Sequence, residues 1–325
     1  MKTIQTDALG SLDGLRVVDV DAPATGDDAV RIRVSAAGLN YVDALMVEGR
    51  YQIKPSVPYR PGSEVTGTVV EAGATAGDWT PGERVFAMPG MGGFSEEVVV
   101  HRSRVVRIPS SMSDGQAATF MQSYMTAWFA FTRRVTLEAG MTMLVTGAGG
   151  GVGLAAVDTA RSRGVRVIAA ASSEEKRSLA LAAGAEAVID TGGEDVKARA
   201  REFGGGGVDV VYDPVGGALA ESCLRALAPM GRYMVVGFVA GIPSLPANHI
   251  LLTNRSVVGV DWGAWMMTNP RENAAMLTEV VAAIGRGELH PVEPVTYPMS
   301  RAADAMRDMQ GRAVAGKVAL QPDFD

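Results

Sequence analysis

The residues best placed to do chemistry form a glycine-rich run after a short apolar segment. The sequence passes from the apolar Met143–Val145 through a turn dense in glycine to a helical pattern that ends near Arg161. A strand, a tight turn and a helix N-terminus in this order make a phosphate cradle, because free backbone N–H groups and the positive end of the helix dipole face the turn. The spacing is that of a dinucleotide-binding turn with alanine in its first position. We therefore expect a pyrophosphate to be bound by Ala148, Gly150, Gly151, Val152 and Gly153.

The context of this turn makes the match more specific. Apolar segments and helix-like segments alternate after it, at the spacing of β-α-β units. The expected strands are 165–171, 187–190, 208–212 and 233–237, and the expected helices are 174–183, 195–202 and 218–226. This alternation predicts an α/β domain of the Rossmann type, with a doubly wound parallel sheet.

The end of the second expected strand bears on the choice of coenzyme. Enzymes that use NAD usually hold the adenosine 2′-hydroxyl with a carboxylate about 20 residues after the glycines. Here Ala171 takes that position, and Ser172, Ser173 and Lys176 follow it. Hydroxyl groups and a cation suit a 2′-phosphate, so the segment favours NADPH over NADH. Alternatively, one of the serines only caps the next helix and the lysine is solvated; capping and phosphate binding can coexist at one helix end.

Composition excludes several classes of protein. The 325 residues carry 30 basic and 36 acidic side chains without a basic block, so nucleic-acid binding is not expected. The single cysteine, Cys223, rules out an internal disulfide and a Cys-cluster metal site. The N-terminus has no signal-peptide pattern, and no apolar run reaches the roughly 18 residues of a membrane span. We expect a cytoplasmic protein without a membrane partner.

The residues before the Rossmann pattern have another character. Up to about residue 118, short alternating or apolar segments are separated by Pro and Gly, which predicts an all-β, barrel-like domain. The strand-like tail 317–320 is expected to return to this domain, which is then discontinuous. The predicted boundaries are 1–118 and 258–325 for the barrel-like catalytic domain and 119–257 for the Rossmann domain.

Six short motifs along the chain together resemble the medium-chain dehydrogenase/reductase superfamily. They are Gly38–Asp43, Pro61–Gly67, the glycine turn, Asp213–Gly217, Val236–Phe238 and Gly316–Lys317. More narrowly, the chain resembles the zinc-independent NADPH:quinone oxidoreductase branch. This resemblance implies a GroES-like β-barrel catalytic domain beside the Rossmann domain, with NADPH as the cofactor.

The resemblance also bears on metal. Zinc-dependent members have Cys at the position of Asn40, His at that of Ser63 and usually Cys at that of Gln122. Glu64 alone cannot make a tetrahedral zinc site, so we expect no metal. Reduction of a quinone or an enone suits such a site, because hydrogen-bond donors can stabilise the charge that arrives with hydride.

By the same resemblance, several residues would contact the coenzyme. Those around the nicotinamide and its ribose would be Asn40, Gln122, Thr126, Gly237, Phe238 and Val239, and Lys317 would reach the ribose-phosphate portion. Asn40 is also a candidate catalytic residue. In the alternative interpretation, Asn40 and Asp43 form a turn that satisfies its own backbone.

Tyr51 stands eleven residues after Asn40. In the related 2-enoyl thioester reductases a tyrosine at this spacing is the proton donor, and a phenol can protonate the α-carbon after hydride reaches the β-carbon. In many quinone-reductase-like members the same tyrosine lines the substrate pocket. Both roles stay open for Tyr51, and Tyr41 is a second candidate for the pocket wall.

These observations favour an NADPH-dependent oxidoreductase that transfers hydride to a quinone or an activated enone. The alternatives are an enoyl-thioester (acyl-CoA) reductase with Tyr51 as proton donor, and an NADPH-binding structural or regulatory protein with weak turnover. In the family, the strand near 256–260 pairs with its twin across a dimer axis, and an uncovered apolar edge would promote aggregation. We therefore expect a homodimer or a homotetramer.

Overall fold

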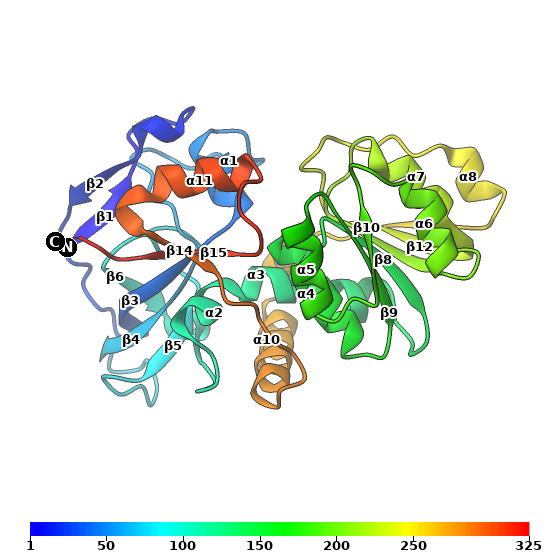
Figure 1. Cartoon of the computed structure of the whole chain (residues 1–325). Coiled ribbons are helices and arrows are strands. Elements are labelled where there is room, and N and C mark those ends of the chain that lie inside the picture. Colours follow the sequence, from blue (N-terminus) through cyan, green and yellow to red (C-terminus); the bar gives the residue numbers. More distant parts are fainter. Residues whose placement is uncertain (325) are drawn as a thin grey trace. The chain divides into compact units, whose positions relative to one another are not determined.

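The computed structural model describes residues 1–324, which form two compact units (Figure 1). The first unit consists of Met1–Met121 and Glu293–Asp325, and the second of Gln122–Val292. The first unit is therefore discontinuous, and its C-terminal strand pairs with a strand from the N-terminal part. No helix within the described residues is both long and apolar enough to cross a membrane.

The second unit is built on a parallel sheet. Its six strands run in the order β10-β9-β8-β11-β12-β13, and every neighbouring pair is parallel. Their bounds are β8 Thr142–Thr146, β9 Arg166–Ala171, β10 Ala187–Asp190, β11 Val208–Asp213, β12 Leu227–Val235 and β13 Ser256–Gly259. The chain starts at the central strand β8, moves to one edge and then returns to the other side, so the strand order reverses between β8 and β11. Ligands of such sheets bind outside the carboxyl ends of the strands at this reversal.

The helices of the second unit lie before, between and after these strands along the chain. They are α3 Met121–Phe129, continued by the π-helical turn Ala130–Arg134, then α4 Gly151–Arg161, α5 Glu174–Ala182, α6 Val196–Phe203, α7 Leu219–Ala226, α8 Ala247–Leu251, α9 Trp262–Thr268 and α10 Pro270–Gly285. Helix α4 packs on β8 and β9, and α5 packs on β9 and β10. Residues of α6 and α7 join Leu144, Ile168 and Tyr233 in one apolar core.

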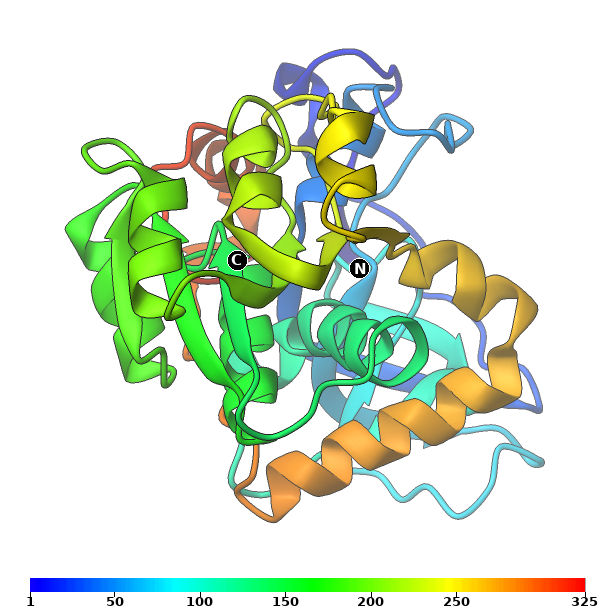
Figure 2. The ribbon, with the colours of Figure 1, turned by 90° about the vertical axis from the view of Figure 1, so that its right-hand side faces the viewer.

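The boundary of the second unit differs from the prediction. The sequence predicts that residues 258–292 belong to the catalytic domain, but in the structure they belong to the second unit. Strand β13 pairs in parallel with β12, and the long orange helix α10 in Figure 2 is tied to α3 by Trp128, whose Nε1 donates to Glu279 at 3.0 Å. An amphipathic helix can bury its apolar face against any neighbour, so its sequence did not reveal which unit it joins.

The first unit is built mainly from antiparallel strands. They are β1 Lys2–Gln5, β2 Arg16–Asp19, β3 Ala29–Leu39, β4 Glu64–Ala72, β5 Arg84–Ala87, β6 Glu97–His101, β7 Val105–Arg107, β14 Val295–Pro298 and β15 Val318–Gln321. The main sheet has the order β14-β15-β3-β4-β5-β7, and β6 also pairs with β3. Strand β15 pairs antiparallel with β3, with Val318 opposite Leu39, which confirms that the tail returns to this unit.

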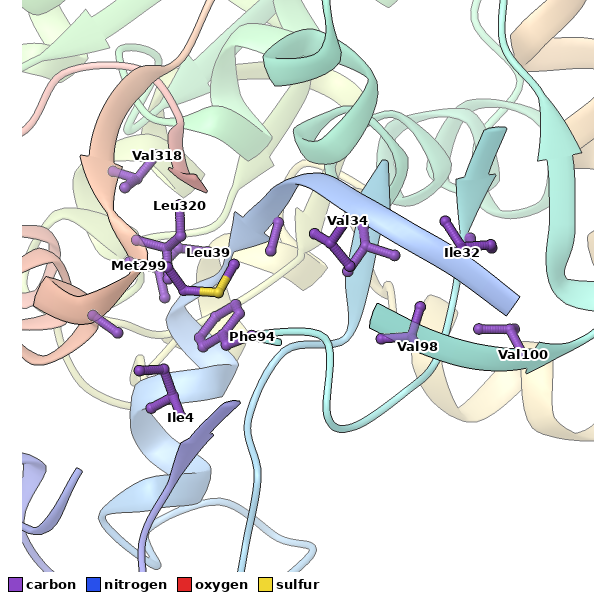
Figure 3. Packing of buried hydrophobic residues seen from close by; sticks show 14 of the residues in the cluster. Ile4, Ile32, Val34, Leu39, Phe94, Val98, Val100, Met299, Val318 and Leu320 are labelled. Atoms are coloured by element: carbon purple, nitrogen blue, oxygen red, sulfur yellow. The ribbon is translucent and has the colours of Figure 1, made fainter. Parts of the chain in front are cut away.

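The core of the first unit draws on segments from both ends of the chain. Figure 3 shows Ile4 and Phe94 packed near Leu39, with Met299 and Leu320 from the C-terminal part in the same cluster. The helices of this unit are α1 Tyr41–Val47, α2 Asp114–Thr119 and α11 Ala302–Gln310. Helix α1 follows directly after β3, so the core fixes the residue that joins them, Asn40.

Candidate functional site

In the second unit, the glycine turn lies between β8 and α4, where the sequence placed it. Gly147 has φ +56°, and Gly150 is the N-cap of α4. A Cβ on Gly153 would lie 2.3 Å from the Gly147 carbonyl oxygen, so this glycine is needed for the helix to pack closely against the turn. A Cβ on Gly150 would meet nothing nearer than 3.5 Å, so packing within the chain does not require glycine there. The open side of Gly150 suits the approach of a phosphate to the backbone.

Lys176 lies beside this turn. A Cβ on Gly149 would come within 2.3 Å of the Lys176 Cβ, so the stem of the lysine covers the glycine. Ser173 is the N-cap of α5, and its hydroxyl accepts a hydrogen bond from the Lys176 backbone N–H at 3.3 Å. Ala171 ends β9 without a carboxylate, and the exposed Ser172 follows it. The serine cap and the stem of Lys176 thus lie together next to the turn.

Arg177, the next residue, is engaged elsewhere. Its Nη1 lies 3.1 Å from Asp190 Oδ1 and donates to the Ala171 carbonyl at 3.4 Å. Asp190 ends β10, the strand beside β9. The ion pair therefore links neighbouring strand ends.

Asp213, at the end of β11, is bonded to the ends of β8 and β12 and to the loop that follows it. Its buried carboxylate accepts hydrogen bonds from the hydroxyls of Thr146 and Tyr233 and from the backbone N–H groups of Val215 (2.9 Å) and Gly216 (3.0 Å). Burial and this carboxylate raise the pKa of Tyr233, which stays a hydrogen-bond donor. Sequence reasoning noted the Asp213 motif but did not foresee its partners, which are 20 and 67 positions away.

The segment that follows β12 packs onto the loop after β11. The Gly237 N–H donates to the Asp213 carbonyl at 3.2 Å, and the Ala240 N–H donates to the Val215 carbonyl at 2.9 Å. These bonds hold Gly237 at the carboxyl edge of the sheet, while the side chains of Phe238 and Val239 are exposed. Exposed apolar side chains at this edge are available to contact a flat ring.

In the first unit, Asn40 is the centre of a buried polar cluster. Its Nδ2 donates to Glu64 Oε1 at 2.7 Å, and its Oδ1 accepts from Lys317 Nζ at 2.8 Å. The Lys317 amine lies 3.8 Å from Glu64 Oε1, and the Asn40 backbone N–H donates to Asp43 Oδ2 at 2.8 Å. The exposed fractions are 6% for Asn40, 1% for Asp43, 0% for Glu64 and 9% for Lys317. We name these four residues the Asn40 cluster.

Burial and the neighbouring charges shift the pKa values of Asp43 and Lys317 in this cluster. Burial is the main cause that raises the pKa of Asp43 to about 7; Glu64 also raises it, while the Asn40 N–H and Lys317 lower it. Burial lowers the pKa of Lys317, and the carboxylates of Glu64 and Asp43 oppose that change. The sequence singled out Asn40 and Lys317 separately, but it did not indicate that their side chains bond to each other or that Glu64 joins them.

The backbone makes room for this cluster at Gly38. A Cβ there would lie 2.1 Å from the Ala118 carbonyl oxygen and 2.7 Å from Glu64 Oε1. Glycine at this position of β3 therefore lets α2 and the Glu64 carboxylate approach the strand. At the start of α1, the Asp43 carboxylate accepts the Asn40 backbone N–H, which is the interaction expected if Asn40 and Asp43 form a turn that satisfies its own backbone.

The remaining predicted site residues lie in both units. Tyr41 begins α1 and Tyr51 lies in the loop after it, where its N–H donates to the Leu45 carbonyl at 3.2 Å. Gln122 and Thr126 lie on α3, and the Thr126 hydroxyl donates to the Gln122 carbonyl at 2.7 Å. Their roles toward a coenzyme or a substrate stay predictions.

The residues present do not fit a zinc site. The positions that would carry zinc ligands hold Asn40, Ser63 and Gln122, and Asn40 is bonded to an ammonium group and a carboxylate. Nowhere in residues 1–324 do three His, Cys, Asp or Glu side chains gather as a metal-binding group. An ammonium group 2.8 Å from the Asn40 oxygen also repels a divalent cation from this place.

Comparison with known proteins identifies the family. The chain is 37% identical over 294 residues to quinone oxidoreductase-like protein 2 of Bos taurus. The matched region covers 90% of this chain and 84% of that protein. The chain belongs to the quinone oxidoreductase branch of the medium-chain dehydrogenase/reductase superfamily. Within this superfamily, residues 26–110 match the alcohol dehydrogenase GroES-like domain and residues 151–281 match the family model described as zinc-binding dehydrogenase.

Solved structures of other medium-chain reductases are similar over the whole chain. A probable oxidoreductase from Mycobacterium abscessus is 34% identical, with a TM-score of 0.88 and 99% of each chain covered. Escherichia coli quinone oxidoreductase complexed with NADPH is 25% identical, with a TM-score of 0.88, 99% of this chain and 100% of that chain covered. The fold is thus a GroES-like domain plus a Rossmann domain, as predicted, and the protein is an oxidoreductase of a family that uses NAD(P).

Proposed function

We propose that this protein is an NADPH-dependent oxidoreductase that reduces a quinone or an activated enone without a metal. The observation that carries the proposal is the Asn40 cluster, in which the amide at one zinc-ligand position is bonded to an ammonium group and to a carboxylate. With no Lewis acid at this place, hydrogen-bond donors must stabilise the negative charge that develops on the acceptor. A quinone or an enone spreads that charge over a conjugated system, which makes this stabilisation sufficient.

Most of the residues proposed for the coenzyme belong to the second unit. The pyrophosphate would lie on the glycine turn, which is formed by Ala148, Gly150, Gly151, Val152 and Gly153. The 2′-phosphate would be bound by Ser172, Ser173 and Lys176. The residues proposed for the nicotinamide portion are Asn40, Gln122, Thr126, Gly237, Phe238 and Val239. When bound, the coenzyme supplies the hydride. The preference for NADPH over NADH rests on the absence of a carboxylate at Ala171 and on the cation at Lys176.

The acceptor would be held by residues of the first unit. Tyr41 and Tyr51 offer aromatic surfaces for a flat ring, and Asn40 offers an N–H group to a carbonyl oxygen. For a quinone, the reduced oxygens can take protons from water. For an enone, a proton must reach carbon, and the Tyr51 hydroxyl is the candidate donor.

The test is a substrate panel followed through NADPH absorbance. Quinones and enones should be reduced with NADPH, and the rate should survive prior treatment with a chelator, with no stoichiometric zinc by elemental analysis. Turnover of enoyl-CoA alone would favour the thioester reductase, and coenzyme binding with negligible turnover across the panel would favour a binding protein. One zinc per chain together with loss of activity on chelation would refute the metal-free proposal.

We also propose that the protein is a homodimer or a homotetramer. Strand β13 forms one edge of the parallel sheet, and its Val257 is exposed. Pairing of β13 with its twin would satisfy the edge hydrogen bonds and cover this side chain. Light scattering of the purified protein tests this, since a mass equal to that of one chain would contradict it.

A further inference from the structure

The Asn40 side chain is held at both ends by groups of opposite charge. Lys317 Nζ donates to its Oδ1 at 2.8 Å, and its Nδ2 donates to Glu64 Oε1 at 2.7 Å. An ammonium group can only donate, and a carboxylate can only accept. If the amide were rotated by 180°, its NH₂ group would face the ammonium and its oxygen would face the carboxylate. In a buried place both contacts would be repulsive, so the amide has one orientation.

This orientation decides what Asn40 can offer to another molecule. Nδ2 carries two hydrogens, and Glu64 takes one of them. Oδ1 is already engaged by Lys317. The second N–H is therefore the group that remains available, and it is a donor whose partner must be an oxygen or another acceptor. A carbonyl oxygen meets that requirement.

The same contacts bear on Lys317. Its side chain is buried, and its amine is bonded to Asn40 and close to Glu64. An amine that binds a coenzyme phosphate would have to give up these contacts or share them. A role through Asn40 needs no rearrangement.

We propose that Lys317 and Glu64 are positioning residues, which orient the Asn40 amide so that its remaining N–H donates to the carbonyl oxygen of the hydride acceptor. This inference rests on the proposed function for the identity of that carbonyl. A hydrogen bond accepted at the amide oxygen strengthens the donors of the same amide, so the Lys317 ammonium also makes the Asn40 N–H a better donor. The cluster thereby performs, with a neutral donor, part of the polarisation for which a zinc-dependent relative uses its metal.

Kinetics of Lys317→Met test the positioning role. The methionine keeps the length and apolar stem of lysine but cannot hold the Asn40 oxygen. We expect kcat for quinone reduction to fall by roughly 10-fold or more, as for loss of one oriented donor, while the Kd of NADPH changes less than about 3-fold. Lys317→Arg should recover part of kcat, because a guanidinium group still only donates. Lys54→Met, at an exposed lysine of the same unit, is the matched control and should behave like the unaltered protein.

Two kinetic outcomes would overturn the inference. If Lys317→Met raised the Kd of NADPH about 10-fold and left kcat unchanged, Lys317 would be a coenzyme ligand. If kcat and Kd both stayed unchanged, the orientation of Asn40 would not matter for the reaction. A thermal melt of each variant separates these outcomes from a loss of fold.

A second measurement does not depend on turnover. The sequence has five asparagines, and Asn40 is the one that lies in the first unit. In protein labelled with ¹⁵N-asparagine, Asn40→Ser identifies the Asn40 NH₂ signals. In Lys317→Met these two hydrogens should exchange with solvent at least 10-fold faster than in the unaltered protein. Equal exchange rates in both proteins would overturn the proposed orientation.

The last measurement uses the unaltered protein, so it can be made even if Lys317→Met does not fold. Duroquinone added to the NADP⁺-loaded protein should shift the Asn40 hydrogen that Glu64 does not hold. Bound duroquinone that leaves this signal in place would overturn the contact to the acceptor. If the oriented amide is seen but no quinone or enone is reduced, the proposed function fails while the orientation of Asn40 stands.

Discussion

The stem of Lys176 lies across Gly149, so that a Cβ on the glycine would be 2.3 Å from the Cβ of the lysine. The two residues belong to the segments that follow β8 and β9, which are neighbours in the parallel sheet. The loop that would hold the pyrophosphate and the helix that would select the ribose substituent are therefore in direct contact. The contact therefore joins the glycine turn to the first turn of α5.

Replacement of Lys176 should change the KM of NADPH but not the KM of NADH. We expect Lys176→Ala to raise the KM of NADPH roughly 10-fold, which corresponds to about 1.4 kcal/mol, and to leave the KM of NADH nearly unchanged. The reason is the loss of a charge-assisted contact that only the 2′-phosphate makes. Steady-state kinetics with both coenzymes measure this. Lys197→Ala on α6 is the matched control, and equal use of NADH and NADPH by the unaltered protein would contradict the proposed selectivity.

Two glycines of the turn should respond differently to alanine. A Cβ on Gly153 would lie 2.3 Å from a backbone oxygen and 2.7 Å from the Ala148 Cα, so Gly153→Ala should lower the free energy of unfolding by about 1–3 kcal/mol. Gly150 has φ −97° and open space around it, so Gly150→Ala should leave stability nearly unchanged but weaken NADPH binding several-fold. Thermal melts and fluorescence titrations separate the effects. A Gly150→Ala protein that binds NADPH normally would argue against a phosphate at this turn.

The buried Asp43 should make stability depend on pH. Its pKa is raised from 3.8 to about 7, so the folded state holds a proton that the unfolded chain has already released between these values. The stabilisation from this protonated form is complete below about pH 4 and is lost as pH rises through 7. Asp43→Asn removes the charge and keeps an oxygen for the Asn40 N–H.

The variant should therefore gain stability relative to the unaltered protein as pH rises from 5 to 8. The expected gain is up to about 3 kcal/mol in the free energy of unfolding, at about 1.4 kcal/mol for each pH unit below the folded pKa. Urea unfolding at both pH values measures it. Asp21→Asn, at an exposed aspartate, should show no such trend. A gain that stays constant from pH 5 to 8 would mean that Asp43 is ionised in the folded protein throughout this range.

The sequence predicted the Rossmann sheet well because local and global signals agree there. The strand 187–190, for example, starts with three apolar residues, and turn residues and a helical pattern follow it, which indicates both the elements and their order. Strand β12 was harder. It begins at Leu227, earlier than predicted. Its start was missed because Pro229 and Gly231 interrupt the apolar pattern, and there its pairing with β11 shifts register between Leu227 and Arg232.

The short helices and the polar cluster were less accessible to sequence analysis. Helices α1 and α11 are brief and lie in a unit dominated by strand patterns, so they were not predicted. Lys317 and Asn40 are far apart along the chain, and only the antiparallel pairing of β15 with β3 brings them together. The alternation of apolar residues predicts that such strands exist, but it does not specify which strand becomes the neighbour of which.

The role of Tyr51 is decided by comparing two kinds of acceptor. If its hydroxyl protonates carbon, Tyr51→Phe should lower kcat for enones by roughly 100-fold or more, and it should hardly change kcat for 1,4-quinones. The reason is that a reduced quinone carries its charge on oxygens, which water can protonate without a positioned acid. If Tyr51 is only part of the pocket wall, phenylalanine keeps the shape, and both acceptors should react nearly as before.

The informative quantity is thus the ratio of the two losses, measured at saturating NADPH. Tyr41→Phe serves as the matched control, because it removes a hydroxyl from the other tyrosine proposed for the wall. A large and equal loss with both acceptors would contradict both roles, since it would mean that Tyr51 supports the fold or the coenzyme. We favour the pocket wall, because nothing else in the chain marks the site as built for a thioester, so the expected ratio is close to one.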